Sequence, residues 1–123
     1  MRLSIFSHGM ELNAEMRAYL ERRLMFAVSR FASKIERIEA GLIDVNGERA
    51  GGVDKRCRIV AKVTGVGRLV VQDDAAELMP LIDRTTDRLG RLVQRKLEFV
   101  RTRGGRQSAS GSGLSGLSVD RRP

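Results

Sequence analysis

The feature that most constrains the fold of this sequence is the changing interval between its apolar residues. In two segments the apolar residues recur at intervals of three and four, which predicts amphipathic helices. In four others they alternate with polar residues or form short apolar runs, which predicts strands. The order along the chain is strand, helix, three strands, helix. It predicts an α+β fold, a β-α-β-β-β-α two-layer sandwich in which both helices cover one face of a four-stranded mixed sheet.

The first helix is predicted to begin after the N-cap residue Asn13 and to run to about Ala32. Its apolar face comprises Met16, Leu20, Leu24, Ala27 and Phe31. The second helix is predicted to begin between Asp74 and Glu77, to hold Pro80 in its first turn, and to end near Arg101. Its apolar stripe comprises Leu78, Leu81, Ile82, Thr85, Leu89, Leu92, Val93 and Val100. Both stripes should lie on the sheet.

Four strands are predicted from alternation. They lie around Leu3 and Ile5, from Ile38 to Leu42, from Arg56 to Val63, and from Arg68 to Val71. The glycine-rich stretch from Asn46 to Asp54 lacks the order of a phosphate-binding loop, so it predicts a hairpin connection. In the third strand Cys57 belongs to the core-facing set, whereas Arg56, Arg58 and Lys62 face the wetter side of the sheet.

The chain of 123 residues is expected to form one domain over residues 1–101. From residue 102 to residue 123 the composition shifts to Gly, Ser and Arg, which predicts a disordered tail. No apolar run approaches the length of a membrane span, and the start does not resemble a secretory signal, so we expect a cytoplasmic protein.

The residues that carry most enzyme and metal chemistry are scarce. The single cysteine, Cys57, and the single histidine, His8, provide no disulfide framework and no metal site, and each is expected to be structural. Asp73 and Asp74, with no basic partner in view, are expected to favour the positive end of the second helix. We therefore predict a protein that is not an enzyme and that has no cofactor and no small-molecule substrate.

The formal net charge of +8 and the pI near 10.9 point to a polyanionic partner. Charge alone does not separate RNA from DNA or from an anionic membrane surface. The placement of the arginines is more informative. Arg84, Arg88, Arg91 and Arg95, spaced by four, three and four residues, fall within roughly 60° of the circumference of the second helix. This set, the arginine stripe, lies beside the apolar face.

On the first helix Arg23, Arg30 and Lys34 gather at the margin of the apolar face, and Arg22 lies further round. Two such helices side by side would line one shared groove with cations that bind phosphate oxygens. The RNA-binding residues predicted are Arg17, Arg22, Arg23, Arg30, Lys34, Arg84, Arg88, Arg91, Arg95 and Lys96. The alternative is that these charges only solvate the helices. The lack of acidic residues within the stripe argues against that alternative, although Asp87 could pair with Arg91.

A likeness to a known family is carried by Leu12 to Phe31, by Asp44 to Gly47 with Gly51 to Cys57, and by Leu81 to Asp83 leading into the arginine stripe. Over these residues the chain resembles the ribosome hibernation promoting factors and ribosome-associated inhibitors. The resemblance extends over essentially Met1 to Arg101. It implies a fold like a double-stranded-RNA-binding domain with an added strand. It also implies binding to rRNA of the small ribosomal subunit between head and body, which silences translation under stress or in stationary phase.

Residue by residue, the resemblance matches Arg17 and Arg23 to basic positions of the family's first helix, and Arg88, Arg91 and Arg95 to those of its second. Phe26 stands where a lysine is common. The chain resembles the short members, which lack a C-terminal dimerisation domain, so a monomer is expected when it is free. Whether it promotes ribosome pairs or blocks single ribosomes stays open. A general RNA- or DNA-binding module and a basic protein-interaction domain are the competing interpretations.

Overall fold

The structure is a computed structural model that describes residues 1–45 and 54–106, without the side chains of residues 103–106. The elements are β1 (Arg2–His8), α1 (Ala14–Val28), the 3₁₀ helix η1 (Ser29–Lys34), β2 (Ile35–Asp44), β3 (Lys55–Val63), β4 (Gly67–Ala75) and α2 (Leu78–Arg106). This order confirms the predicted α+β class and the β-α-β-β-β-α arrangement.

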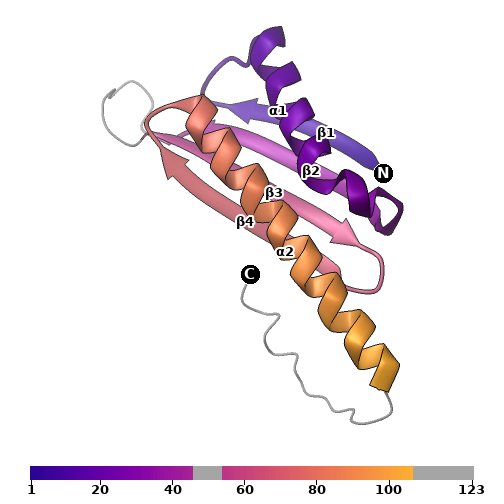
Figure 1. Cartoon of the computed structure of the whole chain (residues 1–123). Helices are drawn as coiled ribbons and strands as arrows, with labels where there is room; N and C mark the ends of the chain where they lie inside the picture. Colours follow the sequence, from indigo (N-terminus) through magenta and orange to yellow (C-terminus); the bar gives the residue numbers. More distant parts are fainter. Residues whose placement is uncertain (46–53, 107–123) are drawn as a thin grey trace.

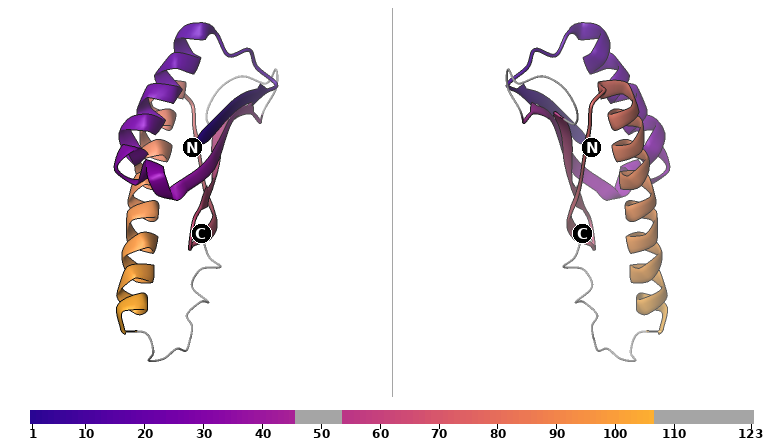
Figure 2. Two further views of the ribbon diagram at one scale, coloured as in Figure 1. Left: turned by 90° about the vertical axis from the view of Figure 1, so that its right-hand side faces the viewer. Right: turned by 90° about the vertical axis from the view of Figure 1, so that its left-hand side faces the viewer.

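The four strands lie in the order β1-β2-β3-β4, so β1 and β4 are the edge strands. The β1–β2 pair is parallel, and the β2–β3 and β3–β4 pairs are antiparallel. Helices α1 and α2 lie side by side on one face of this sheet (Figure 1, Figure 2), which leaves the other face without a covering layer within the described residues. The lower part of α2 continues past the turn between β3 and β4 (Figure 1).

The core lies between the helices and the sheet. The prediction is confirmed for the central residues of both apolar faces. The fully buried ones include Leu20, Leu24, Leu81, Leu89 and Val93. The sheet contributes the fully buried Ile38, Ala40, Leu42, Cys57, Ile59 and Ala61. The prediction that Val100 belongs to the apolar stripe of the second helix is wrong, since its side chain is 37% exposed. The reason is the overhang of α2 beyond the sheet, which leaves the last turns of the helix without a partner layer among residues 1–45 and 54–106.

Helix α1 begins as predicted, because Asn13 Oδ1 accepts a hydrogen bond of 2.7 Å from the backbone N–H of Met16. Its predicted end near Ala32 is wrong, since the α-helix stops at Val28 and continues as η1. A 3₁₀ segment tightens the last turns and commonly ends a helix where the chain must change direction. Here the change of direction brings the chain into β2.

Strand β4 is longer than predicted. It continues beyond Val71 to Ala75, where Asp74 pairs in register with Arg56 of β3, and α2 begins only at Leu78. The prediction that Asp73 and Asp74 lie at the start of α2 without basic partners is therefore wrong. Both residues lie on the strand, and each contacts an arginine. Sequence reasoning ended the strand early because two consecutive aspartates are unusual in a strand.

The structure describes the connection between β3 and β4 and the ends of the connection between β2 and β3. Gly65 and Gly67 adopt positive φ values of 83° and 109° in the turn between β3 and β4. The predicted hairpin between the second and third strands is confirmed by the β2–β3 pairing, but most of its connection, residues 46–53, lies outside the described residues.

Helix α2 runs past the expected end near Arg101 to Arg106, and residues 107–123 of the predicted tail are not described.

Gly90 of α2 lies close to the backbone of α1. A Cβ atom placed on Gly90 of α2 would lie 2.7 Å from the backbone carbonyl oxygen of Ala27 in α1. That distance is shorter than a van der Waals contact, so any side chain there would push the helices apart. In the described part of the chain, neither helix combines the length and the apolar content that a membrane span requires.

Candidate nucleic-acid interface

The arginine stripe lies on the outside of α2, where all four of its residues are exposed. Helix α2 packs against β3 and β4 on one side and against α1 on the other. The contacts of each arginine decide whether its guanidinium group is open to a partner or is used within the fold.

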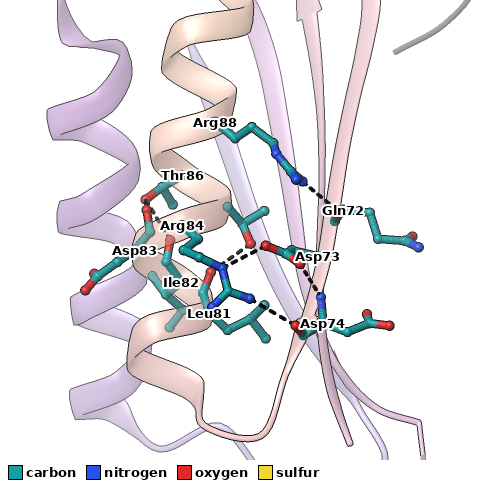
Figure 3. A network of polar contacts seen from close by, with 10 residues as sticks. Gln72, Asp73, Asp74, Leu81, Ile82, Asp83, Arg84, Thr86 and Arg88 are labelled. Atoms are coloured by element: carbon teal, nitrogen blue, oxygen red, sulfur yellow. Dashed lines mark hydrogen bonds and ion pairs between the residues drawn. The ribbon is translucent and has the colours of Figure 1, made fainter. Parts of the chain in front are cut away.

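Arg84 and Arg88 reach from α2 to the edge strand β4 (Figure 3). Arg84 Nε donates to Asp73 Oδ2 at 3.0 Å, and Arg84 Nη2 donates to the carbonyl oxygen of Asp74 at 3.0 Å. Arg88 Nη1 donates to the carbonyl oxygen of Gln72 at 2.9 Å. Gln72 and Asp74 are alternate residues of an edge strand, so these carbonyls lie on its unpaired side. The two arginines thus cover part of an edge that would otherwise be open to pairing.

The opposite edge of the sheet has a similar contact. Arg17 Nη2 of α1 donates to the carbonyl oxygen of Ile5 in β1 at 3.3 Å. Each edge strand is therefore covered by arginine from the helix that lies over it. These contacts give Arg17, Arg84 and Arg88 a structural role that requires no ligand.

The pKa of Asp73 depends on its contact with Arg84. The hydrogen bond from Arg84 lowers the pKa of this carboxyl group, and the Asp74 backbone N–H lowers it further, against the opposing effect of burial. Because the pKa is lowered in the folded state, the contact stabilises the fold above the unfolded pKa of Asp73. That stabilisation is lost as the pH falls through the folded pKa.

We therefore predict that Arg84→Gln raises the pKa of Asp73 towards its ordinary value, measured by NMR titration of the Asp73 carboxyl carbon. The difference in stability between the native chain and the variant should be present at neutral pH and should disappear in acid. Arg95→Gln serves as the control, because Arg95 makes no hydrogen bond or ion pair within the described residues. An unchanged Asp73 pKa in Arg84→Gln would rule out this contact in solution.

Arg91 and Arg95 are more open than the other two arginines of the stripe. Arg91 Nη1 lies 2.6 Å from Asp87 Oδ2, one turn earlier on α2, and the side chains are 65% and 55% exposed. An exposed pair of this kind contributes little to stability and is easily exchanged for another anion. Arg95 is exposed and keeps its guanidinium donors free of contacts within the described part of the chain.

A hollow of about 710 Å³, here named the β4-edge groove, lies where these arginines meet the sheet. It is lined by Arg58, Val70, Val71, Gln72, Arg88, Arg91, Leu92 and Arg95. Among the described residues that line it, four are arginines and none is acidic. Arg58 was not among the predicted contacts, because alternation in β3 placed it on the face away from the helices. Its register with Gln72 on the edge strand was the missing signal.

A second hollow of about 410 Å³, here named the interhelix groove, runs between α1 and α2. It is lined by Arg23, Phe26, Ala27, Ser29, Arg30, Asp87, Gly90, Arg91 and Gln94. Arg91 lines both grooves, so cations follow one another from α1 across α2 to the edge of β4.

The prediction of one cationic groove shared by both helices is correct for Arg23, Arg30 and Arg91 only. Arg84, Arg88 and Arg95 lie on the side of α2 that faces β4. The side that faces α1 holds acidic and amide groups instead. Arg23 Nε lies 3.2 Å from Asp83 Oδ1, and Arg30 Nη2 donates to Gln94 Oε1 at 3.1 Å. Asp83, Asp87 and Gln94 thus occupy the interval between the arginine stripe and α1.

Asp83 connects the two helices. The Tyr19 hydroxyl donates to Asp83 Oδ1, and this hydrogen bond raises the pKa of Tyr19. Arg23 Nε forms an ion pair with the same oxygen, but its N–H is not oriented to make a hydrogen bond to it. This buried N–H therefore has no hydrogen-bond partner among the described residues. The guanidinium group of Arg23 also lies 5.6 Å from the ring centre of Phe26, whose side chain is 77% exposed.

The remaining predicted residues lie around this surface. Arg22 is exposed on α1, with its guanidinium group 5.7 Å from the ring centre of Tyr19. Lys34 is exposed at the end of η1, and Lys96 is half-buried on α2. Phe26 lines the interhelix groove together with Arg23 and Arg30.

Cys57 is fully enclosed in the core, and burial raises the pKa of its thiol to about 12. At neutral pH it is therefore a protonated thiol in an apolar environment, which is unsuited to nucleophilic chemistry. His8 is exposed at the end of β1. The chemistry that this surface supports is the binding of anions by guanidinium groups.

By sequence, the chain matches no protein family pattern and no curated protein. Among solved structures it is similar to the crystal structure of the N-terminal domain of Protein Y from Thermus thermophilus, with a TM-score of 0.62 and 25% identity, over 77% of this chain and 98% of that one. It is also similar to a ribosomal subunit interface protein from Coxiella burnetii, with a TM-score of 0.62 and 14% identity, over 80% and 97% of the two chains.

These two structures belong to hibernation factors, so the likeness to that family indicated by the sequence is confirmed. The match covers nearly the whole length of each solved chain. The Coxiella match, at its lower identity, concerns the fold.

Proposed function

We propose that this chain, which resembles the ribosome hibernation factors in fold, is a ribosome-associated inhibitor of translation. In this proposal it binds rRNA of the small subunit through the cations of the interhelix and β4-edge grooves, and it occupies the path of tRNA and mRNA under stress or in stationary phase. The observation that carries the proposal is the open basic surface around Arg91 and Arg95 on a chain with this fold. The proposed activity is binding in the cytoplasm and involves no catalysis.

The chemistry favours a phosphate backbone as the ligand. Arg91 and Arg95 expose guanidinium forks, which bind phosphate oxygens through two parallel hydrogen bonds. Arg58 and Arg88 line the same groove, so several phosphates can be contacted along one strand. Each contact releases counterions from the RNA, which adds free energy at moderate salt.

The residues contribute unequally in this proposal. Arg91, Arg95 and Arg30 are the main contacts, because their side chains are exposed and line the two grooves. Half-buried Arg58 adds a contact within the β4-edge groove, and exposed Arg22 adds one beside the interhelix groove on α1. Arg17, Arg84 and Arg88 are bound to the edge strands and use only their remaining donors. Arg23, Lys34 and Lys96 add to the positive potential of the same surface.

Recognition is proposed to follow the shape and charge of folded rRNA and not its base sequence. On the described part of the sheet, Phe6 is the one Phe, Tyr or Trp side chain that faces away from the helices. Sheets that read single-stranded RNA stack successive bases on more than one aromatic ring. A single ring provides no such platform.

Co-sedimentation tests the proposal. Full-length protein is mixed with ribosomes and with separated small and large subunits at near-physiological salt, and each mixture is run through a sucrose gradient. We expect the protein to move with ribosomes and small subunits and to stay at the top with large subunits. Equal retention by an unrelated structured RNA would favour the general nucleic-acid-binding module instead. The position of the ribosome peak distinguishes paired from single ribosomes.

We also propose that residues 1–101 form the ribosome-binding domain and that the segment from residue 102 is an appendage to it. Since α2 runs to Arg106, a shortened chain should end after that residue and keep the helix complete. Binding by this shortened chain at full strength would support the proposed boundary.

A further inference from the structure

The face of the sheet away from the helices carries a row of four cations, one from each strand. Arg2 pairs in register with Arg37, Arg37 with Lys62, and Lys62 with Arg68. All four side chains are exposed, and each is followed or preceded by a residue that is buried or half-buried under the helices. This set is here named the cation row.

The register of the strands forces these charges together. Neighbouring strands lie about 4.8 Å apart, so the row spans roughly 14 Å across the sheet. Like charges directly opposite each other on adjacent strands are destabilising. The row contains three such adjacent pairs in succession, and the fold holds them without an acidic residue at any of the four positions.

The acidic residues nearby neutralise the row only in part. Glu39 lies 3.8 Å from Arg37 Nε, and Glu36 lies 3.8 Å from Lys62 Nζ. Both distances are too long for a hydrogen bond, and the two carboxylates are 46% and 49% exposed. Such pairs are screened by water and salt and leave the donors of Arg37 and Lys62 available.

The cation row lies on the opposite face of the sheet from the interhelix groove. The helices that carry the arginine stripe and the interhelix groove lie on one side of the sheet (Figure 2), whereas the residues of the row alternate with buried ones and so face the other side, which the β4-edge groove reaches through Arg58. The sheet stands between the cation row and the interhelix groove, so a rigid RNA helix in that groove does not reach the row.

We propose that the cation row is a second binding site for an RNA phosphate backbone, so that one molecule of this protein holds two RNA segments, one on each face. This inference rests on the proposed function for the identity of the first segment. Charge complementarity carries it: four side-by-side cations spaced across the sheet match the closely spaced negative charges of a nucleic acid strand.

A bridging assay tests the proposal with the full-length chain. One RNA duplex of about 16 base pairs, the length that a double-stranded-RNA-binding domain spans, is immobilised, and a second, fluorescent duplex is captured through the protein. The variant Arg37→Gln/Lys62→Gln/Arg68→Gln should bind the immobilised duplex within about two- to threefold of the native chain. It should capture at least tenfold less of the second duplex. The salt dependence of capture, as log K against log salt, should become shallower by about two to three units.

The control is Arg56→Gln/Asp74→Asn, which removes an ion pair from the same sheet face and leaves the net charge unchanged. It should bridge like the native chain, and thermal melting verifies that all variants are folded. Absence of bridging by the native chain, unchanged bridging by the triple variant, or equal loss in the control would each overturn the second site. Those outcomes leave ribosome co-sedimentation intact, whereas failure of co-sedimentation overturns the proposed function itself.

Discussion

Replacing Arg91 and Arg95 together by glutamine is expected to weaken binding to the small ribosomal subunit by roughly 10- to 100-fold, with a shallower salt dependence by about two units. These two arginines have the most open guanidinium groups of the stripe, so their loss removes phosphate contacts without disturbing the fold. Filter binding or sedimentation across a salt series measures both quantities. Full affinity in this variant would refute the assignment of the surface.

Two controls sharpen this result. Lys55→Gln/Arg56→Gln removes the same number of charges from β3, but there each cation is already paired, with Asp54 at 2.9 Å and Asp74 at 2.9 Å. It should lose far less affinity than the Arg91/Arg95 variant. Asp87→Asn should act in the opposite direction, because it releases Arg91 from its partner and removes a negative charge from the interhelix groove.

Gly90→Leu is expected to lower the free energy of unfolding by about 3 kcal/mol or more, and Gly90→Ala by a smaller amount. Even the Cβ of alanine would lie 2.7 Å from the Ala27 carbonyl oxygen, which belongs to the backbone of α1 and cannot rotate away. The intrinsic preference of helices for alanine, worth about 1 kcal/mol, acts in the opposite direction. Urea denaturation of the two variants measures the balance.

The matched control for Gly90 is Arg95→Ala, an exposed change on the same helix that should alter stability by less than about 0.5 kcal/mol. An increase in stability in Gly90→Ala would mean that helix propensity outweighs the contact and that the two helices are not in backbone contact. A Gly90→Ala variant that is folded but weakened should also bind ribosomes less well, since wider helix separation changes the interhelix groove.

The fold was predictable because its signals are local and consistent. Asn13 caps α1 through the bond expected of that residue type, and Pro80 lies in the first turn of α2 where it costs no helical hydrogen bond. The alternation of Cys57, Ile59 and Ala61 determined which face of β3 is buried. These patterns depend on neighbours within a few positions, which the sequence displays directly.

The details that escaped prediction depend on contacts between distant segments. Asp73 and Asp74 extend β4 because Arg84 and Arg56 bind them, and neither partner is near in sequence. Gly90 looks like a poor helix residue until Ala27 is placed opposite it. The cation row also needs the strand register before Arg2 and Arg68 can be placed on one line.

The candidate site was predictable as a set of cations but not as a geometry. The spacing of Arg84, Arg88, Arg91 and Arg95 indicates one side of α2, but not that the first two reach the edge of β4. Arg58 was left out because alternation assigns a side chain to a face and says nothing of how near that face is to an edge. Helical periodicity gives the direction of a side chain, whereas its partner depends on the packing of the whole sandwich.

In the proposed function, the surface around Arg95 lies on small-subunit rRNA. A photo-crosslinking residue in place of Arg95, in full-length protein bound to ribosomes, tests it most directly, with Met79 at the start of α2 as the control position. We predict crosslinks from position 95 to rRNA of the small subunit and few from position 79. Crosslinks from position 95 to ribosomal proteins alone, or to large-subunit rRNA, would contradict the account.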